Sequence, residues 1–176
     1  MNVGRWDLRD RRFEDFFRFD YPQLLAALRL VTGDDDRARD ALDEACARAC
    51  ERLARGEEIE TLGAWIRVVA FNAARDSHRR RRSERAARER LKARAATNGD
   101  ASAEVALSLD VRTALATLDV RQREVVVLFY FLDRPVDAIA DELAIPAGTV
   151  KAALHRARAA LRVVLDDRHP RSEGSR

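Results

Sequence analysis

The chain has 176 residues, of which 36% are charged and 6% aromatic, and its formal net charge at pH 7 is +3. This length holds one medium domain or two small helical ones, and sparse glycine and proline favour helices over sheet. No apolar run reaches the roughly 18 residues of a membrane span, and no apolar signal segment follows the N-terminus, so we expect a cytoplasmic protein.

The first predicted helices are rich in aromatic residues at helical spacing. Phe13, Phe16 and Phe17 precede Tyr21, and Asp20-Tyr21-Pro22 forms a plausible joint between two helices. Because these rings fall on one amphipathic face, we expect them to pack in the core rather than stack on bases.

An acidic helix follows. Thr32-Gly33-Asp34-Asp35 ends one helix and opens the next, with glycine as C-cap and aspartate as N-cap. Residues 34–44 hold six acids against two arginines, a net charge of −4. The inward residues of this helix are Ala38, Leu42, Ala45, Ala49 and Leu53, and its flank carries Asp40, Asp43 and Glu44. This flank is either a solvated surface or a docking site for another protein.

Cys46 and Cys50 lie one turn apart on the same helix. Two thiols without a nearby histidine cannot complete a tetrahedral zinc site, and a reducing cytosol disfavours a disulfide. We therefore predict small buried side chains and assign them no chemistry.

The next predicted helix combines an apolar face with a cationic one. Its apolar face consists of Leu62, Trp65, Ile66, Val69, Ala70 and Ala73. Trp65 lies within that stripe, which favours a core anchor over a stacking platform. Asn72 offers a donor and an acceptor, and positive charge comes from Arg67, Arg75, Arg79 and Arg80. Residues 75–94 hold ten basic residues against three acids, a net of +7 that favours a polyanionic or acidic partner.

A small, polar segment at 95–109 predicts a flexible boundary between domain 10–94 and domain 110–165. Within the second domain, 125–132 is the most hydrophobic run of the chain. Periodicity alone allows a buried strand there, but the helical surroundings favour a buried helix. The tail, 166–176, is predicted to be disordered.

Two helical periodicities meet in 136–165 across the break Ile145-Pro146-Ala147-Gly148, which predicts a helix, a tight turn and a second helix beginning near Pro146. One stripe of the second helix is apolar (Val150, Leu154, Ala157, Leu161), and an adjacent stripe is cationic (Lys151, His155, Arg158, Arg162). Four basic residues and no acid occur between 147 and 162, which favours a DNA groove over mere solvation.

Here the chain resembles a known family. Gly148-Thr149-Val150-Lys151 and Leu154-His155-Arg156-Ala157-Arg158 look like region four of extracytoplasmic-function sigma factors, the small bacterial subunits that direct RNA polymerase to promoters. Residues 65–76 are similar to the region two signature of that family, and 36–50 have the layout of its polymerase-gripping helix. The resemblance covers about 13–165 and implies an all-α fold of two small helical domains, a region two bundle and a region four helix-turn-helix, joined by a flexible linker.

The resemblance also implies three functional sets. Contacts to the upstream, minus-35, promoter element would come from Thr149, Lys151, Ala152, His155, Arg156 and Arg158. In relatives, region two melts the downstream, minus-ten, promoter element and holds a flipped base. The residues that would contact this element here are Arg67, Asn72, Arg75, Arg79 and Arg80. Contacts to core polymerase would come from Asp40, Asp43 and Glu44. The implied partners are core RNA polymerase and promoter DNA, with an anti-sigma factor left open.

Several residues depart from the family pattern. Asp43 replaces a usual glutamine, Asp119 replaces a usual proline and so weakens a helix-start signal, and Ala138 replaces a usual glutamate. Ala152-Ala153 replaces Ser-Arg, and the loss of a reading arginine typically costs about 1 to 3 kcal/mol of discrimination.

Two alternatives to a sigma factor stay open. One is a stand-alone helix-turn-helix regulator, which predicts dimerisation. The other is a sigma-like interaction protein that reads promoters poorly, as the departures would suggest. No phosphate-binding loop, metal-spaced histidine pair or Ser-His-Asp set occurs in the sequence, so we expect no enzyme, metal or cofactor.

Overall fold

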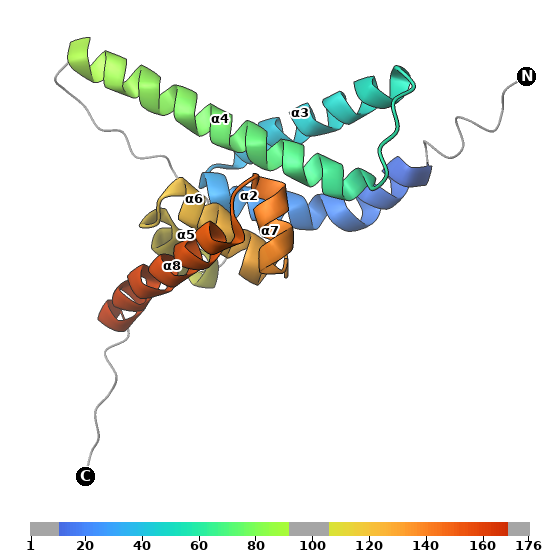
Figure 1. Cartoon of the computed structure of the whole chain (residues 1–176). Coiled ribbons are helices and arrows are strands. Elements are labelled where there is room, and N and C mark those ends of the chain that lie inside the picture. Colours follow the sequence, from blue (N-terminus) through green and yellow to red (C-terminus); the bar gives the residue numbers. More distant parts are fainter. Residues whose placement is uncertain (1–10, 92–105, 169–176) are drawn as a thin grey trace, which may run out of the picture. The chain divides into compact units, whose positions relative to one another are not determined.

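The computed structural model describes residues 11–91 and 106–168, and within them the side chains of 11–81 and 111–164. Every regular element in these ranges is helical, as the sequence predicts (Figure 1). The chain divides into two compact units, Met1–Ala87 and Arg88–Arg176. Most of the predicted linker, 95–105, and most of the predicted tail, 169–176, lie outside the described residues, whereas 106–109 and 166–168 are helical.

In the first unit the elements are η1 (Phe16–Asp20), α2 (Tyr21–Thr32), α3 (Asp35–Ala54) and α4 (Leu62–Leu91), where η denotes a π-helix. Gly33 ends α2 in the left-handed conformation, with φ 68°, and its N–H donates to the carbonyl of Arg29 at 2.9 Å. Asp34 opens α3 by accepting a hydrogen bond from the N–H of Arg37 at 3.0 Å. Both predicted caps are confirmed.

The core of the first unit lies where α2, α3 and α4 face one another. The inward face of α3 is buried as predicted, at Ala38, Leu42, Ala45, Ala49 and Leu53. The buried residues of α4 are Leu62, Ile66, Ala70, Phe71 and Ala74. Trp65 is half-buried beneath the guanidinium of Arg52, 5.8 Å from its ring centre, so it anchors α4 on α3 from the edge of the core.

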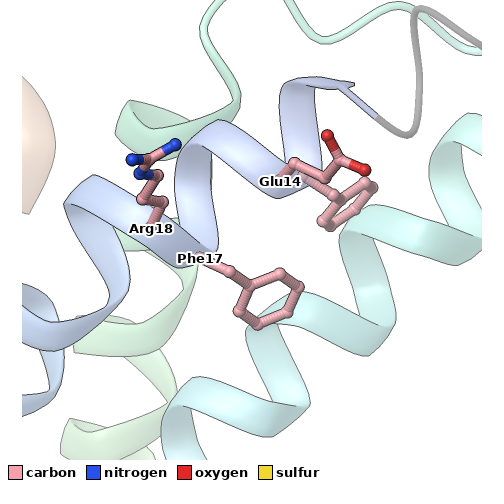
Figure 2. Close-up of a pocket in the computed structure, with 4 residues that line it drawn as sticks. Glu14, Phe17 and Arg18 are labelled. Carbon is pink, nitrogen blue, oxygen red and sulfur yellow. The ribbon is translucent and has the colours of Figure 1, made fainter.

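The aromatic segment before α2 differs from its prediction. Phe16 is buried, but Phe17 is 50% exposed and Phe19 is 65% exposed. Phe17 follows the buried Phe16 by one residue and therefore lies on a different side of η1, so the prediction of burial is wrong for Phe17. Phe17 and Phe13 line a shallow surface pocket, in which the ring of Phe17 points toward α3 (Figure 2).

The prediction that both cysteines are buried is wrong for Cys50, which is exposed, whereas Cys46 is half-buried. Cys50 follows the buried Ala49 by one residue, a rotation of about 100° around the helix. Both thiols are free.

In the second unit the elements are α5 (Ala106–Ala116), α6 (Val120–Val126), η2 (Val127–Phe131), α7 (Val136–Leu143) and α8 (Ala147–Arg168). The expectation that Asp119 weakens the start of α6 is wrong. Its carboxylate accepts from the N–H of Gln122 at 2.8 Å, while the Gln122 side chain accepts from the N–H of Asp119 at 3.3 Å. Asp119 therefore starts the helix with a capping box.

The hydrophobic run 125–132 is helical, as predicted, and is divided between α6 and η2. Its first four residues are buried, but Tyr130 is 58% exposed and Phe131 is 40% exposed. Both rings lie in the second half of η2, after the buried Val127 and Leu128, and the prediction of burial is wrong for them.

The predicted helix-turn-helix is confirmed in α7 and α8. Ala144 ends α7 in the left-handed conformation, with φ 51°, and Ile145 donates to the carbonyl of Ala140 at 2.9 Å. Pro146 immediately precedes α8, and its carbonyl accepts from the N–H of Val150 at 3.2 Å. The two helices pack through Ile139, Leu143, Val150, Leu154 and Ala157, all of them buried.

In the described ranges, no helix combines the length and the apolar character that membrane crossing requires. The described side chains also contain no cluster of three or more histidine, cysteine or acidic residues suited to a metal ion.

Candidate nucleic-acid interface

The outer face of α8 carries the whole set that sequence reasoning assigned to upstream DNA. The side chains of Thr149, Lys151, Ala152, His155, Arg156 and Arg158 are all exposed. The opposite face of the helix, at Val150, Leu154 and Ala157, is at most 3% exposed and packs in the core. The α-helical period thus separates a core face from a cationic one, as the sequence predicts.

The cations of this face are available to a polyanion. Among the described residues, Lys151, Arg156, Arg158 and Arg162 form no ion pair within 4.0 Å. In the first unit, by contrast, Arg39 and Arg48 pair with Asp35 and Glu44 on their own helix. A phosphate reaching α8 would therefore displace no carboxylate.

Arg158 differs from its neighbours on α8 because it is held in place. Its Nε donates a hydrogen bond to the hydroxyl of Tyr130 at 2.7 Å. Its guanidinium lies 5.7 Å from the ring centre of Tyr130 and 6.0 Å from that of Phe129. Sequence reasoning missed Tyr130, because the hydrophobic run around it predicts burial.

Ala152 and Ala153, which replace the Ser-Arg of the family pattern, lie on two different surfaces of α8. Ala152 is exposed on the outer face of α8, whereas Ala153 is 1% exposed and lies in the core. Only Ala152 therefore belongs to the surface that could face DNA. Ala138, the departure in α7, is half-buried.

Only some of the α4 residues that the sequence assigns to the downstream promoter element lie together on one side of the helix. Asn72, Arg75 and Arg79 follow at spacings of three and four, so they share one stripe of the helix. Arg80 is exposed but turned about 100° from Arg79, and Arg67 is half-buried. Arg79 also contacts the carboxylate of Asp76 at 3.4 Å.

The acidic flank of α3 is exposed at Asp40, Asp43 and Glu44. Glu44 pairs with Arg48 at 2.5 Å, whereas Asp40 and Asp43 form no ion pair with any described residue. Asp43 also acts on α2: burial raises the pKa of Tyr21, and the charge of Asp43 raises it further. The flank thus presents two carboxylates without ion-pair partners among the described residues, and one of them, Asp43, acts on Tyr21 at the start of α2.

Comparison with known proteins assigns each unit. The Sigma-70 region 2 family model matches residues 16–84, and the Sigma-70, region 4 model matches residues 108–161. The RNA polymerase sigma-E factor of Streptomyces coelicolor is 34% identical over 151 residues, covering 85% of this chain and 84% of that protein. The RNA polymerase sigma-E factor of Streptomyces avermitilis is 32% identical over 157 residues, covering 89% and 86%.

A solved structure shares the fold. The sigma factor RpoE of Bartonella quintana, in complex with the anti-sigma factor NepR, gives a TM-score of 0.69 at 22% identity. The match covers 88% of this chain and 96% of that chain.

Proposed function

This chain belongs to the sigma-70 family as an extracytoplasmic-function sigma factor, and from that premise we propose how its two units divide the work of promoter recognition. As a sigma factor, it binds core RNA polymerase and directs transcription initiation at promoter DNA. The observation that carries this function is the presence of region 2 and region 4, in that order, on two compact units. We propose 10–94 and 110–165 as the working domains and 95–109 as their linker.

The second unit, in this proposal, reads the upstream promoter element through α8. Support comes from an exposed face without ion pairs at Lys151 and Arg156, on a helix fixed by its buried side to α7. Such a helix fits the major groove, where its first turns reach base edges and its flanks reach phosphates. Thr149, Lys151, Ala152, His155 and Arg156 are the candidates for base and groove contacts.

The first unit is proposed to melt the downstream element along α4. Opening duplex DNA costs about 1 to 2 kcal/mol per base-pair step, so the protein must stabilise the separated strands. The stripe of Asn72, Arg75 and Arg79 offers amide hydrogen bonds to an unpaired base and charge to the backbone. Arg67 and Arg80 would serve at the edges of that stripe.

The acidic flank of α3 is proposed to bind core polymerase, since Asp40 and Asp43 are exposed and without basic partners among the described residues. The solved neighbour was captured with an anti-sigma factor, and we propose a protein regulator of that class for this chain too. We propose that the protein acts in the cytoplasm, where it would meet core polymerase and promoter DNA. RNA synthesis belongs to the polymerase, and no catalytic step is assigned to this chain.

The two alternatives are less well supported. A stand-alone regulator would leave the region 2 match over 16–84 without a role. A sigma-like protein that reads promoters poorly was motivated partly by Ala153, yet that residue lies in the core rather than on the reading face.

Run-off transcription tests the proposed function. The purified chain is mixed with core polymerase that lacks its own specificity subunit, on a pool of genomic fragments, and the transcripts are mapped. We expect start sites that share two upstream sequence elements and that vanish when the chain is omitted. Transcripts with unrelated start regions, or none above the core enzyme alone, would contradict the proposal.

A further inference from the structure

The contact between α8 and η2 singles out one arginine of the cationic face. Arg158 is clamped by Tyr130, which accepts a hydrogen bond from its Nε, and by the rings of Phe129 and Tyr130 beside its guanidinium. Both Arg158 and Tyr130 are nevertheless exposed. A guanidinium that packs against aromatic rings and still reaches solvent is preorganised rather than buried.

The contact between Arg158 and Tyr130 leaves most of their hydrogen-bond donors available to an anion. Arginine carries five N–H donors, and the bond to Tyr130 occupies one, so the two terminal nitrogens keep their N–H groups. The hydroxyl of Tyr130 accepts that bond and can still donate its own proton. Neither residue forms an ion pair with a described carboxylate. The two side chains together therefore present several donors and one positive charge to a single acceptor.

The position of Arg158 along α8 indicates which kind of anion the two side chains would bind. Arg158 follows Lys151 by seven residues, about 10 Å further along the same stripe. In a helix-turn-helix the first turns of the second helix reach base edges, so a residue two turns later faces the wall of the groove. That wall consists of phosphodiesters, for which arginine and tyrosine are both common donors.

We propose that Tyr130 and Arg158 form a phosphodiester-binding pair on duplex DNA, in which Tyr130 positions Arg158 and neither residue reads base sequence. The pair fixes the register of α8 in the groove and leaves discrimination to the residues of its first turns. This inference rests on the proposed role of α8 and extends it to η2, an element outside the helix-turn-helix.

The test uses the full chain and two short duplexes of equal length and different sequence. Affinity is measured by fluorescence anisotropy across a series of salt concentrations. For Arg158→Gln we expect binding about tenfold weaker near 0.1 M salt on both duplexes, and a log–log salt slope smaller by about 0.9. The control Arg55→Gln removes the same charge from an exposed arginine of the first unit, paired with Glu57, and should leave the slope unchanged.

A double-mutant cycle separates positioning from general packing. Tyr130→Phe keeps the ring and removes the hydroxyl, and should weaken binding about fivefold with little change in salt slope. In the Arg158→Gln background the same change should have a clearly smaller effect, because the arginine to be positioned is gone and only the bond from the hydroxyl itself is lost. Thermal unfolding by circular dichroism establishes that each variant is folded.

Two results would contradict the proposal that Tyr130 and Arg158 bind a phosphodiester as a pair. One is an Arg158→Gln variant whose salt slope equals that of the native chain. The other is a Tyr130→Phe effect of equal size in both backgrounds. Neither outcome depends on polymerase, so the proposed function can fail or stand in run-off transcription independently of this result.

Discussion

The two thiols of α3 illustrate how one turn of helix sets chemical reactivity. Burial raises the pKa of the Cys46 thiol to about 11, and the nearby charges of Asp43 and Cys50 act in the same direction. Cys50, one turn later, is exposed. The thiolate is the nucleophile, so Cys46 holds only about one part in a thousand of its reactive form at pH 8.

Alkylation with iodoacetamide at pH 8 should therefore modify one thiol per chain quickly. We expect Cys50→Ser to abolish the fast phase and Cys46→Ser to retain it. The slow phase of Cys46 should accelerate about tenfold per pH unit until the pH approaches 11, because its thiolate fraction grows in that proportion. Mass spectrometry after a short pulse measures both phases, and a fast phase lost in Cys46→Ser would contradict this account.

The basic residues of α3 and α8 differ in how they are paired. Exposed ion pairs such as Arg39 with Asp35 contribute at most about 1 kcal/mol to stability. Their effect on binding is larger, because a paired cation must give up its carboxylate before it can meet a phosphate. Lys151, Arg156 and Arg162 have no such partner among the described residues, which suits them to a nucleic-acid surface.

At the scale of elements, both π-helical segments expose aromatic rings. η1 exposes Phe17 and Phe19, and η2 exposes Tyr130 and Phe131. η1 lies between helical residues on both sides, whereas η2 ends the helix that begins with α6. π-helical turns occur frequently at functional sites, and Tyr130 of η2 accepts the hydrogen bond from Arg158.

The start of α6 depends on its capping box, so Asp119→Ala should destabilise the second unit. The change removes the acceptor for the Gln122 N–H, and we expect a loss of about 1 kcal/mol in the free energy of unfolding. Denaturant unfolding monitored by circular dichroism measures the effect. Asp141→Ala removes an exposed aspartate from within α7 and is the matched control. An equal effect in both variants would show that the cap is not the cause.

At the scale of the whole molecule, each unit carries its own core, so a surface change in one unit should leave the other intact. The three proposed surfaces lie on different helices: polymerase on α3, downstream DNA on α4 and upstream DNA on α8. Their functions should therefore be separable by mutation.

The double variant Asp40→Lys with Asp43→Lys should lose co-elution with core polymerase, because it reverses both uncompensated charges of the flank. Its affinity for duplex DNA should not fall, because the change only adds positive charge. Lys151→Ala with Arg156→Ala should behave in the opposite way, with polymerase binding retained and DNA affinity reduced on the order of a hundredfold. Size-exclusion chromatography and anisotropy give the two readouts. If either variant lost both activities, the assignment of polymerase binding to α3 and of upstream DNA binding to α8 would be wrong.

The amino-acid sequence alone predicts the helical class, the caps at Gly33 and Asp34, the inward face of α3 and the two faces of α8. These features are local: they follow from 3.6-residue periodicity and from side chains that bond their own backbone within a few residues. The resemblance of 65–76 and 148–158 to the sigma-factor family is also visible in the sequence, because each motif is contiguous.

The packing of the helices sets which aromatic rings reach the surface and which cations stay unpaired. The two π-helical segments left no signal in the sequence pattern. Arg158 and Tyr130 are 28 residues apart in the sequence, and their hydrogen bond forms because α8 packs against α6, the helix that continues into η2. Periodicity describes one helix at a time, whereas contacts between helices depend on how their faces are packed.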